Sequence, residues 1–148
     1  MANDEWRTPE WVWKPYGPFD LDAAAIAENT VAPRFITKEM NALTCDWRLV
    51  CPAPVPTKVW CNPPYSKNAG PLDRWVNKFF ERRWFGFEIT ALLPADTSTK
   101  WFHRIWSARN EPGITINFSE RRVRHIDPAT GKPGGSPKFG SMIVEFLP

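Results

Sequence analysis

The sequence lacks most features that mark secreted, membrane or metal-binding proteins. Its three cysteines, Cys45, Cys51 and Cys61, are odd in number and show no CxxC spacing. That pattern argues against a disulfide framework and against a zinc site, so we expect free structural thiols and no metal. No apolar run approaches the roughly 20 residues that a membrane span requires. Met1 to Trp11 have no secretory leader, so we expect no membrane partner and no secretion.

The length and the charge permit a single domain with a polyanionic partner. A chain of 148 residues can bury a core without disulfide support, so we assign residues 1–148 to one domain. The net charge of +3 and the isoelectric point of about 8.9 allow binding to a polyanion without requiring it. Cationic side chains concentrate in the last third of the chain, at Arg121, Arg122, Arg124, Lys132 and Lys138.

A short apolar run that begins at Lys58 ends in the tetrapeptide Asn62-Pro63-Pro64-Tyr65. Two adjacent prolines remove two backbone donors and fix two φ angles, so the chain must turn after this strand. The residue before a proline is held extended, which places the Asn62 amide at the strand tip. Asn62 Oδ1 and the Pro63 carbonyl can accept hydrogen bonds from the two N–H groups of an exocyclic amine. Tyr65 can stack on the planar ring that carries this amine. The motif predicts a site for a planar amine, although a Pro-Pro turn also closes ordinary strands.

An earlier segment carries a second candidate site. Residues 18–22 alternate apolar and acidic positions and end at Asp22, which three alanines follow. An acid at the end of a first strand, before small residues, is where open α/β sheets bind nucleotide-like cofactors. The glycines that usually form this turn are absent. From the residues alone, Asp22 is either a cofactor contact or a surface carboxylate.

The remaining pattern favours an α/β fold. Capping residues and apolar spacing predict helices over 9–14, 72–84 and 100–107. Thr8 is the expected cap of the first helix, with Pro9 at its first position, and Thr99 lies within the segment that caps the last. Strands are expected at 18–22, 35–37, 59–61 and 87–93, and then at 113–118, 121–126 and 139–146 around a tight turn at 119–120. We therefore predict a central, mixed, mostly parallel sheet with flanking helices and a C-terminal antiparallel portion.

With these stretches identified, the chain resembles the phage-type DNA N6-adenine methyltransferases, which use S-adenosylmethionine. The resemblance covers most of the chain. It rests on Trp6-Arg7-Thr8-Pro9, Phe19-Asp20-Leu21-Asp22-Ala23-Ala24-Ala25, Asn41-Ala42-Leu43 with Asp46-Trp47, Val59-Trp60-Cys61-Asn62-Pro63-Pro64-Tyr65, Leu92-Leu93-Pro94-Ala95 with Thr99-Lys100-Trp101-Phe102-His103, and Phe139-Gly140-Ser141-Met142.

The resemblance implies a Rossmann-like methyltransferase fold, an S-adenosylmethionine cofactor and double-stranded DNA as substrate. On that pattern Asn62, Pro63, Pro64 and Tyr65 form the catalytic loop. The resemblance also implies a cytoplasmic protein, in the host cell if a phage encodes it. It does not indicate an oligomeric state. The expected cofactor contacts are Thr8 and Pro9 at the methionine end, Asp22 and Ala23 at the first-strand turn and Asp46 at the adenine, with Glu39 a candidate for the ribose.

The residues also suggest a mechanism and leave rivals open. Two acceptors that bind the N6 amino group of a flipped adenine can localise the nitrogen lone pair. The protein then mainly has to align this nitrogen with the methyl group, and no thiolate is needed. The cations Arg121, Arg122, Arg124, Lys132 and Lys138 are candidate phosphate contacts or a solvated face. We expect His103 and His125 to be structural. The alternatives are methylation of RNA or of a protein glutamine, and a non-catalytic nucleic-acid-binding relative.

Overall fold

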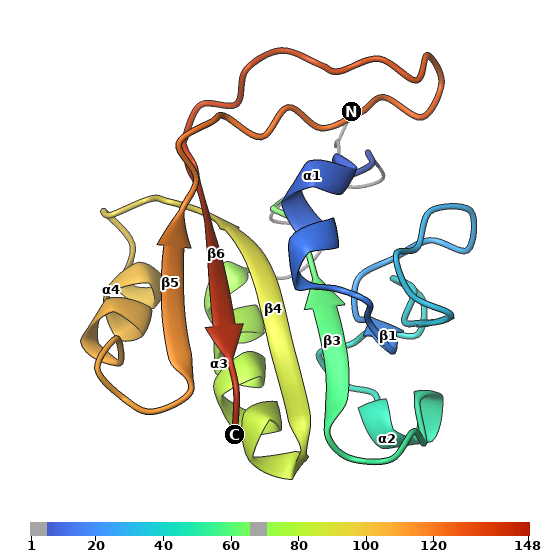
Figure 1. Ribbon diagram of the computed structural model, residues 1–148, viewed down its shortest axis with the longest axis vertical. Coiled ribbons are helices and arrows are strands. Elements are labelled where there is room, and N and C mark those ends of the chain that lie inside the picture. The colour runs from blue at the N-terminus through green and yellow to red at the C-terminus, as the bar shows by residue number, and fades with distance from the viewer. Residues whose placement is uncertain (1–5, 66–70) are drawn as a thin grey trace.

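The computed structural model describes residues 6–65 and 71–148 and has a six-stranded sheet at its centre (Figure 1). The strands lie in the order β2-β1-β3-β4-β6-β5. The pairs among β2, β1, β3 and β4 are parallel, and β6 runs antiparallel to both of its neighbours, β4 and β5. This arrangement confirms the predicted α/β class with a mixed, mostly parallel sheet. The bounds are β1 Leu21–Asp22, β2 Arg34–Phe35, β3 Thr57–Cys61, β4 Phe87–Pro94, β5 Ile114–Phe118 and β6 Ser141–Phe146.

Helices cover both faces of the sheet. The two long ones, α3 (Leu72–Arg82) and α4 (Lys100–Ser107), lie behind it in Figure 1, and α1 (Glu10–Trp13) lies in front. The predicted helix over 100–107 is confirmed, and Thr99 Oγ1 caps it by accepting from Phe102 N at 3.3 Å. The remaining helical segments are η1 (Lys14–Tyr16), α2 (Trp47–Val50) and η3 (Arg83–Phe85). Within the described ranges, no helix has the length and apolar character needed to cross a membrane.

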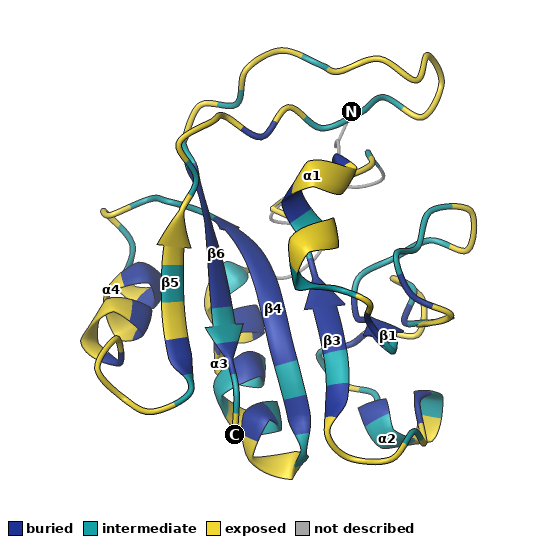
Figure 2. Cartoon of the chain, in the orientation of Figure 1, coloured by how far each residue is buried: buried dark blue, intermediate teal, exposed yellow. Residues whose placement is uncertain are grey.

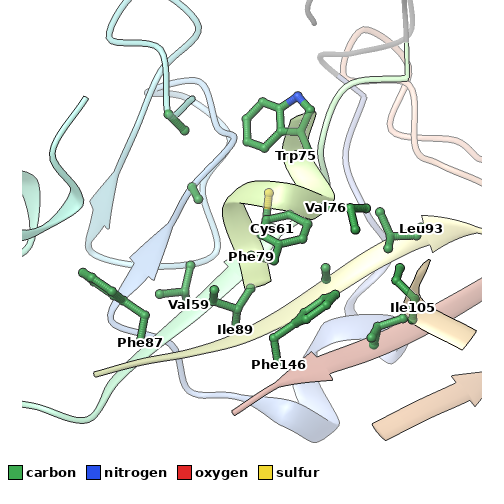
Figure 3. Close-up of a cluster of buried hydrophobic side chains, with 14 of the residues drawn as sticks. Val59, Cys61, Trp75, Val76, Phe79, Phe87, Ile89, Leu93, Ile105 and Phe146 are labelled. Carbon is green, nitrogen blue, oxygen red and sulfur yellow. The ribbon is translucent and has the colours of Figure 1, made fainter. Parts of the chain in front are cut away.

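Alternation along the strands divides the core between these two faces. Successive strand residues point to opposite sides of a sheet, and β3 follows this rule. Val59 and Cys61 pack with α3 and α4, whereas Trp60 packs with Val12 of α1. The larger cluster, behind the sheet, includes Phe79 of α3 and residues of β4 and β6 (Figure 3). Because both faces are buried, the central strands read as nearly continuous apolar runs.

One predicted strand is wrong. Residues 121–126 pair with no neighbouring strand along their length, and only Ile126 forms an isolated bridge. Val123 and Ile126 are the apolar positions, and their spacing of three cannot place both on one face of a strand. Val123 is instead buried on the α1 side of the sheet. Residues 119–140, which we call the arm, leave β5, run over α1 and return to β6 (Figure 1).

Candidate active site

A cavity opens where several strands end at one edge of the sheet. Asn62 follows the last residue of β3, Pro94 ends β4, and Ser141 begins the antiparallel β6. These three positions therefore meet at the same edge and line a cavity of about 560 Å³. Such a volume is within the range of small-molecule sites. Residues 63–65, the arm and Trp6 supply the rest of its wall.

The Asn62 side chain is held by two residues that are distant in the sequence. Its Nδ2 donates to Thr8 Oγ1 at 3.1 Å and lies 3.2 Å from His125 Nε2. Its Oδ1 is buried and has no hydrogen-bond partner among the residues that the structure describes. Buried polar atoms almost always have partners, so an unpaired acceptor at a cavity wall marks the place where a donor from a ligand fits.

Backbone pairing explains why Thr8 and His125 reach the same amide. Arg7 and Ile126 form an antiparallel bridge, with Arg7 N donating to Ile126 O at 2.9 Å and Ile126 N to Arg7 O at 2.8 Å. One step along each chain from that bridge, Thr8 stands opposite His125, and opposed side chains lie on the same face. Burial lowers the pKa of His125 below its usual 6.5, so the ring is neutral at pH 7.

Tyr65 is anchored at its hydroxyl and open along its ring. The hydroxyl donates to Leu92 O of β4 at 3.0 Å, and burial raises the pKa of the phenol, so it stays protonated. The residue nevertheless keeps 43% of its surface exposed, and it lines the cavity. An aromatic ring with one fixed end and a free face is suited to stacking against a planar group.

Asp22 is buried at the end of β1, beside β3. Its Oδ1 accepts from Ala24 N at 3.2 Å and its Oδ2 from Val31 N at 3.1 Å, which holds the loop that follows the strand. Burial raises the pKa of this carboxyl from 3.8 to about 6, against the effect of the two N–H groups. Ala23 is buried next to it and donates its N–H to Trp60 O. The structure thus brings Asp22 and Ala23 to the strand next to the catalytic loop.

The other expected cofactor contacts are more scattered. Thr8 lies against Asn62, and Pro9, expected within the first turn of α1, is its N-cap. Thr8, which the sequence predicted as that cap, makes no cap bond because its hydroxyl accepts from Asn62.

Asp46 is exposed and caps α2, accepting from Arg48 N at 2.9 Å. Arg48 Nη1 donates to Thr57 Oγ1 at the start of β3. The helix α2 therefore lies near the end of β3 opposite Asn62 (Figure 1). Asp46 is therefore not brought to the catalytic loop, and Glu39 lies exposed in the turn after β2.

The basic residues lie on the arm and not on a hairpin at the sheet edge. Arg122 Nη1 donates to Pro137 O at 3.3 Å and Arg124 Nε to Gly134 O at 2.7 Å, so these two arginines tie the two limbs of the arm together. The Arg121 guanidinium lies 4.3 Å from the ring centre of Trp11 on α1. Lys132 and Lys138 are exposed, and Lys138 lines the cavity. The arm remains largely exposed on its outer side, with Val123 as its buried contact (Figure 2).

Sequence reasoning missed the position of His125. Its contact with Asn62 spans 63 residues, and no local pattern encodes such a separation. The packing of the arm against the segment at Trp6 was also not predicted. Trp6 packs so closely on Gly134 that any Cβ at residue 134 would clash with the indole. The available signals were weak: a chain with only two histidines, and a tryptophan beside the Thr-Pro pair.

Comparison with known proteins identifies the family of the chain. Residues 1–148 match the model of the family described as DNA N-6-adenine-methyltransferase (Dam). The chain is 33% identical over 153 residues to the DNA N-6-adenine-methyltransferase of Haemophilus phage HP1 (strain HP1c1), an alignment that covers 99% of this chain and 80% of that protein. It is 40% identical over 157 residues to the DNA N-6-adenine-methyltransferase of Escherichia phage T1, which covers 96% of this chain and 62% of that protein.

Proposed function

Because the chain belongs to the DNA N-6-adenine-methyltransferase (Dam) family, we propose that it transfers a methyl group to the N6 amino group of adenine in double-stranded DNA. The observation that carries this proposal is the unpaired, buried Oδ1 of Asn62 at the cavity wall. An adenine inside a duplex cannot reach this atom, so the base must flip into the cavity. The exposed ring of Tyr65 would receive one face of the base.

Asn62 and Pro63 supply the chemistry that this chain contributes. The adenine N6 lone pair is delocalised into the ring and is a poor nucleophile until the N–H bonds leave the ring plane. Asn62 Oδ1 and the Pro63 carbonyl would each accept one of those N–H bonds and direct the lone pair at the methyl group. A thiolate plays no part, because Cys61 is fully buried and burial raises the pKa of its thiol.

A methyl donor is required by the family, and S-adenosylmethionine is the one we propose. When bound, it supplies a methyl group on a positively charged sulfonium. The residues fit such a cation, because the buried Asp22 carboxyl has a raised pKa and would gain from a nearby positive charge. Asp22 and Ala23 would border the donor at the end of β1, and Thr8 and Pro9 would border it near Asn62. The contact between Asp46 and the donor's adenine stays a prediction, since Asp46 also caps α2.

The arm is the proposed DNA-binding element. Its cations Arg121, Arg122, Arg124, Lys132 and Lys138 are exposed, and the arm borders the cavity that would receive the base. Arginine can hold one limb of the arm and still offer further N–H donors to a phosphate. We propose that residues 1–148 act as one methyltransferase domain, and that the activity is exerted in the cytoplasm, which is that of the host cell if a phage encodes the protein.

The test of the proposed function is methylation of mixed-sequence DNA with tritium-labelled S-adenosylmethionine, followed by nucleoside analysis. The label should appear in N6-methyl-2′-deoxyadenosine released from the DNA. RNA and protein in parallel reactions separate this proposal from amino methylation of those substrates. A protein that binds nucleic acid but neither binds S-adenosylmethionine in calorimetry nor labels any of the three would be a non-catalytic relative.

Tyr65 provides the first prediction. Tyr65→Ala should weaken productive capture of the base by about 1–3 kcal/mol, because it removes the stacking surface. Tyr65→Phe and Tyr65→Trp should be milder, since both keep an aromatic face and lose only the bond to Leu92 O. The measurement is the KM and kcat for a DNA duplex, with binding of a duplex that contains a mismatched target adenine. Equal losses in all three variants would contradict a stacking role.

The cationic residues of the arm provide the second prediction. Arg121→Gln, Arg122→Gln and Arg124→Gln combined should flatten the salt dependence of DNA binding, by about 0.9 in the logarithmic slope for each phosphate that the variant no longer neutralises. Arg122 and Arg124 also tie the arm, so a second variant, Lys132→Gln with Lys138→Gln, tests charge without those bonds. The control removes Arg74, Arg104 and Arg109 from the helix side of the sheet, an equal change in net charge. If the slope changes equally with the control, the arm is not the surface that binds DNA.

A further inference from the structure

The orientation of the Asn62 amide decides whether the catalytic loop can work. An amide can sit in two orientations that exchange its oxygen and its nitrogen. Only one of them points an acceptor at an incoming amino group. In the structure, Nδ2 faces Thr8 and His125, and Oδ1 is the unpaired atom. The reverse orientation would present N–H groups to the N6 amino group, and two donors repel each other.

Of the two neighbours of Nδ2, only His125 distinguishes these orientations. The Thr8 hydroxyl can donate or accept, so it would satisfy either end of the amide. His125 Nε2 lies 3.2 Å from Asn62 Nδ2. A neutral imidazole with its proton on Nδ1 offers only a lone pair at Nε2, and this is the tautomer in which Nε2 accepts from Nδ2. The same lone pair would repel Oδ1. Neutral His125 in this Nδ1-protonated tautomer therefore selects one orientation of the amide, and Thr8 completes the set of acceptors around Nδ2.

We propose that His125, together with Thr8, is a positioning residue that holds the Asn62 amide with Oδ1 directed at the adenine N6 amino group. This inference rests on the proposed function and deepens it. It also assigns a purpose to the bridge between Arg7 and Ile126, which sets Thr8 and His125 opposite each other. The arm would then serve the reaction directly, because it delivers His125 to the catalytic loop.

Protonation of His125 should remove its preference for the amide orientation that directs Oδ1 at the amino group. An imidazolium donates at both ring nitrogens, so Nε2–H would face the N–H groups of Nδ2 and favour the reversed amide. The ionisable groups around the ring are Arg7 across the bridge, Arg124 and Asp127 on its own limb, and Lys138 on the facing limb at the cavity wall. Burial lowers the pKa of His125 below 6.5, so the loss should occur on the acid side of that value.

The test compares wild type with His125→Gln, His125→Ala and, as a control, His103→Gln over a pH range of about 5 to 9. Glutamine can place an amide oxygen near the position of Nε2, which keeps an acceptor that does not titrate. We expect wild-type kcat to fall on the acid side, and His125→Gln to lack that fall. His125→Ala should lower kcat by about 10–100-fold at every pH, with little change in the KM for DNA. His103 lies exposed on α4 with Nε2 2.7 Å from Thr97 O, and its replacement should keep the acid-side fall.

A second readout follows the interaction without relying on activity. Nitrogen–proton NMR of the side-chain amides, with Asn62 identified by its loss in Asn62→Ala, should show the Asn62 N–H signals titrating with the His125 pKa. That titration should vanish in His125→Gln. An unchanged acid-side fall of kcat in His125→Gln, or wild-type kcat in His125→Ala, overturns the positioning role. Absence of the amide titration overturns the hydrogen bond, and a wild-type protein that leaves DNA unmethylated removes the proposed function and this role with it.

Discussion

Asn62→Ala should lower methyl transfer to DNA by at least about 10²–10³-fold, the loss typical of removing one preorganised polar group from a reacting centre. Alanine removes the unpaired Oδ1 and leaves the Pro63 carbonyl as the sole acceptor for the amino group. Binding of S-adenosylmethionine should be largely spared, because the proposed contacts at Asp22 and Ala23 lie at the end of the neighbouring strand. Single-turnover transfer and calorimetry of cofactor binding measure the two effects separately.

Two matched variants make this result specific. Asn77→Ala performs the same truncation on the outer side of α3 and should leave the rate unchanged. Asn62→Asp keeps acceptor oxygens but loses the N–H groups that face Thr8 and His125. It should retain part of the activity, with an optimum moved toward acid pH, where a protonated His125 can donate to the carboxylate. Wild-type turnover by Asn62→Ala would remove the catalytic assignment.

The second large effect concerns the dependence of stability on pH through Asp22. Its carboxyl pKa is about 6 in the folded protein and 3.8 as a free group. A folded pKa above the unfolded one means that the contribution to stability is complete below pH 3.8 and is lost as the pH rises through 6. At 1.36 kcal/mol for each pKa unit, the loss amounts to about 3 kcal/mol.

Comparison with Asp22→Asn isolates this contribution. Asparagine cannot ionise, so the free energy of unfolding of wild type minus that of the variant should fall by about 3 kcal/mol, mostly between about pH 4 and pH 6. The opposite contributions of His125, whose pKa is lowered, and of Glu81 and Asp96, whose pKa values are also lowered, are common to both proteins and cancel. Urea unfolding followed by circular dichroism measures the difference. A difference that is flat with pH would show that Asp22 does not ionise in the folded protein at the pKa stated.

Local patterns were sufficient to predict the part of the structure that consists of single elements. The apolar spacing of residues 72–84 and 100–107 predicted α3 and α4, because one face of each helix packs on the sheet. The paired prolines at 63 and 64 placed Asn62 beyond a strand tip, since proline ends a strand regardless of its surroundings. The sequence therefore predicted the α/β class and the position of the motif at the carboxyl end of β3.

Tertiary contacts explain what could not be predicted. The wrong strand over 121–126 came from β-branched residues whose burial is set by the α1 side of the sheet and not by a strand partner. Thr8 had the local form of a helix cap, but a hydrogen bond across 54 residues takes its hydroxyl. His125 carried no local signal at all. Each of these outcomes depends on how the arm and the first segment meet, which is not encoded within any short window.

The bridge between Arg7 and Ile126 also affects how the protein would respond to heat. It joins the exposed arm to the segment that carries Thr8 through two backbone hydrogen bonds, whereas the helices and the central strands share a large buried core. Segments with little buried surface open before the whole molecule unfolds. Gentle warming should therefore release the arm and silence the enzyme reversibly, while the far-ultraviolet signal of α3 and α4 still reports an intact scaffold.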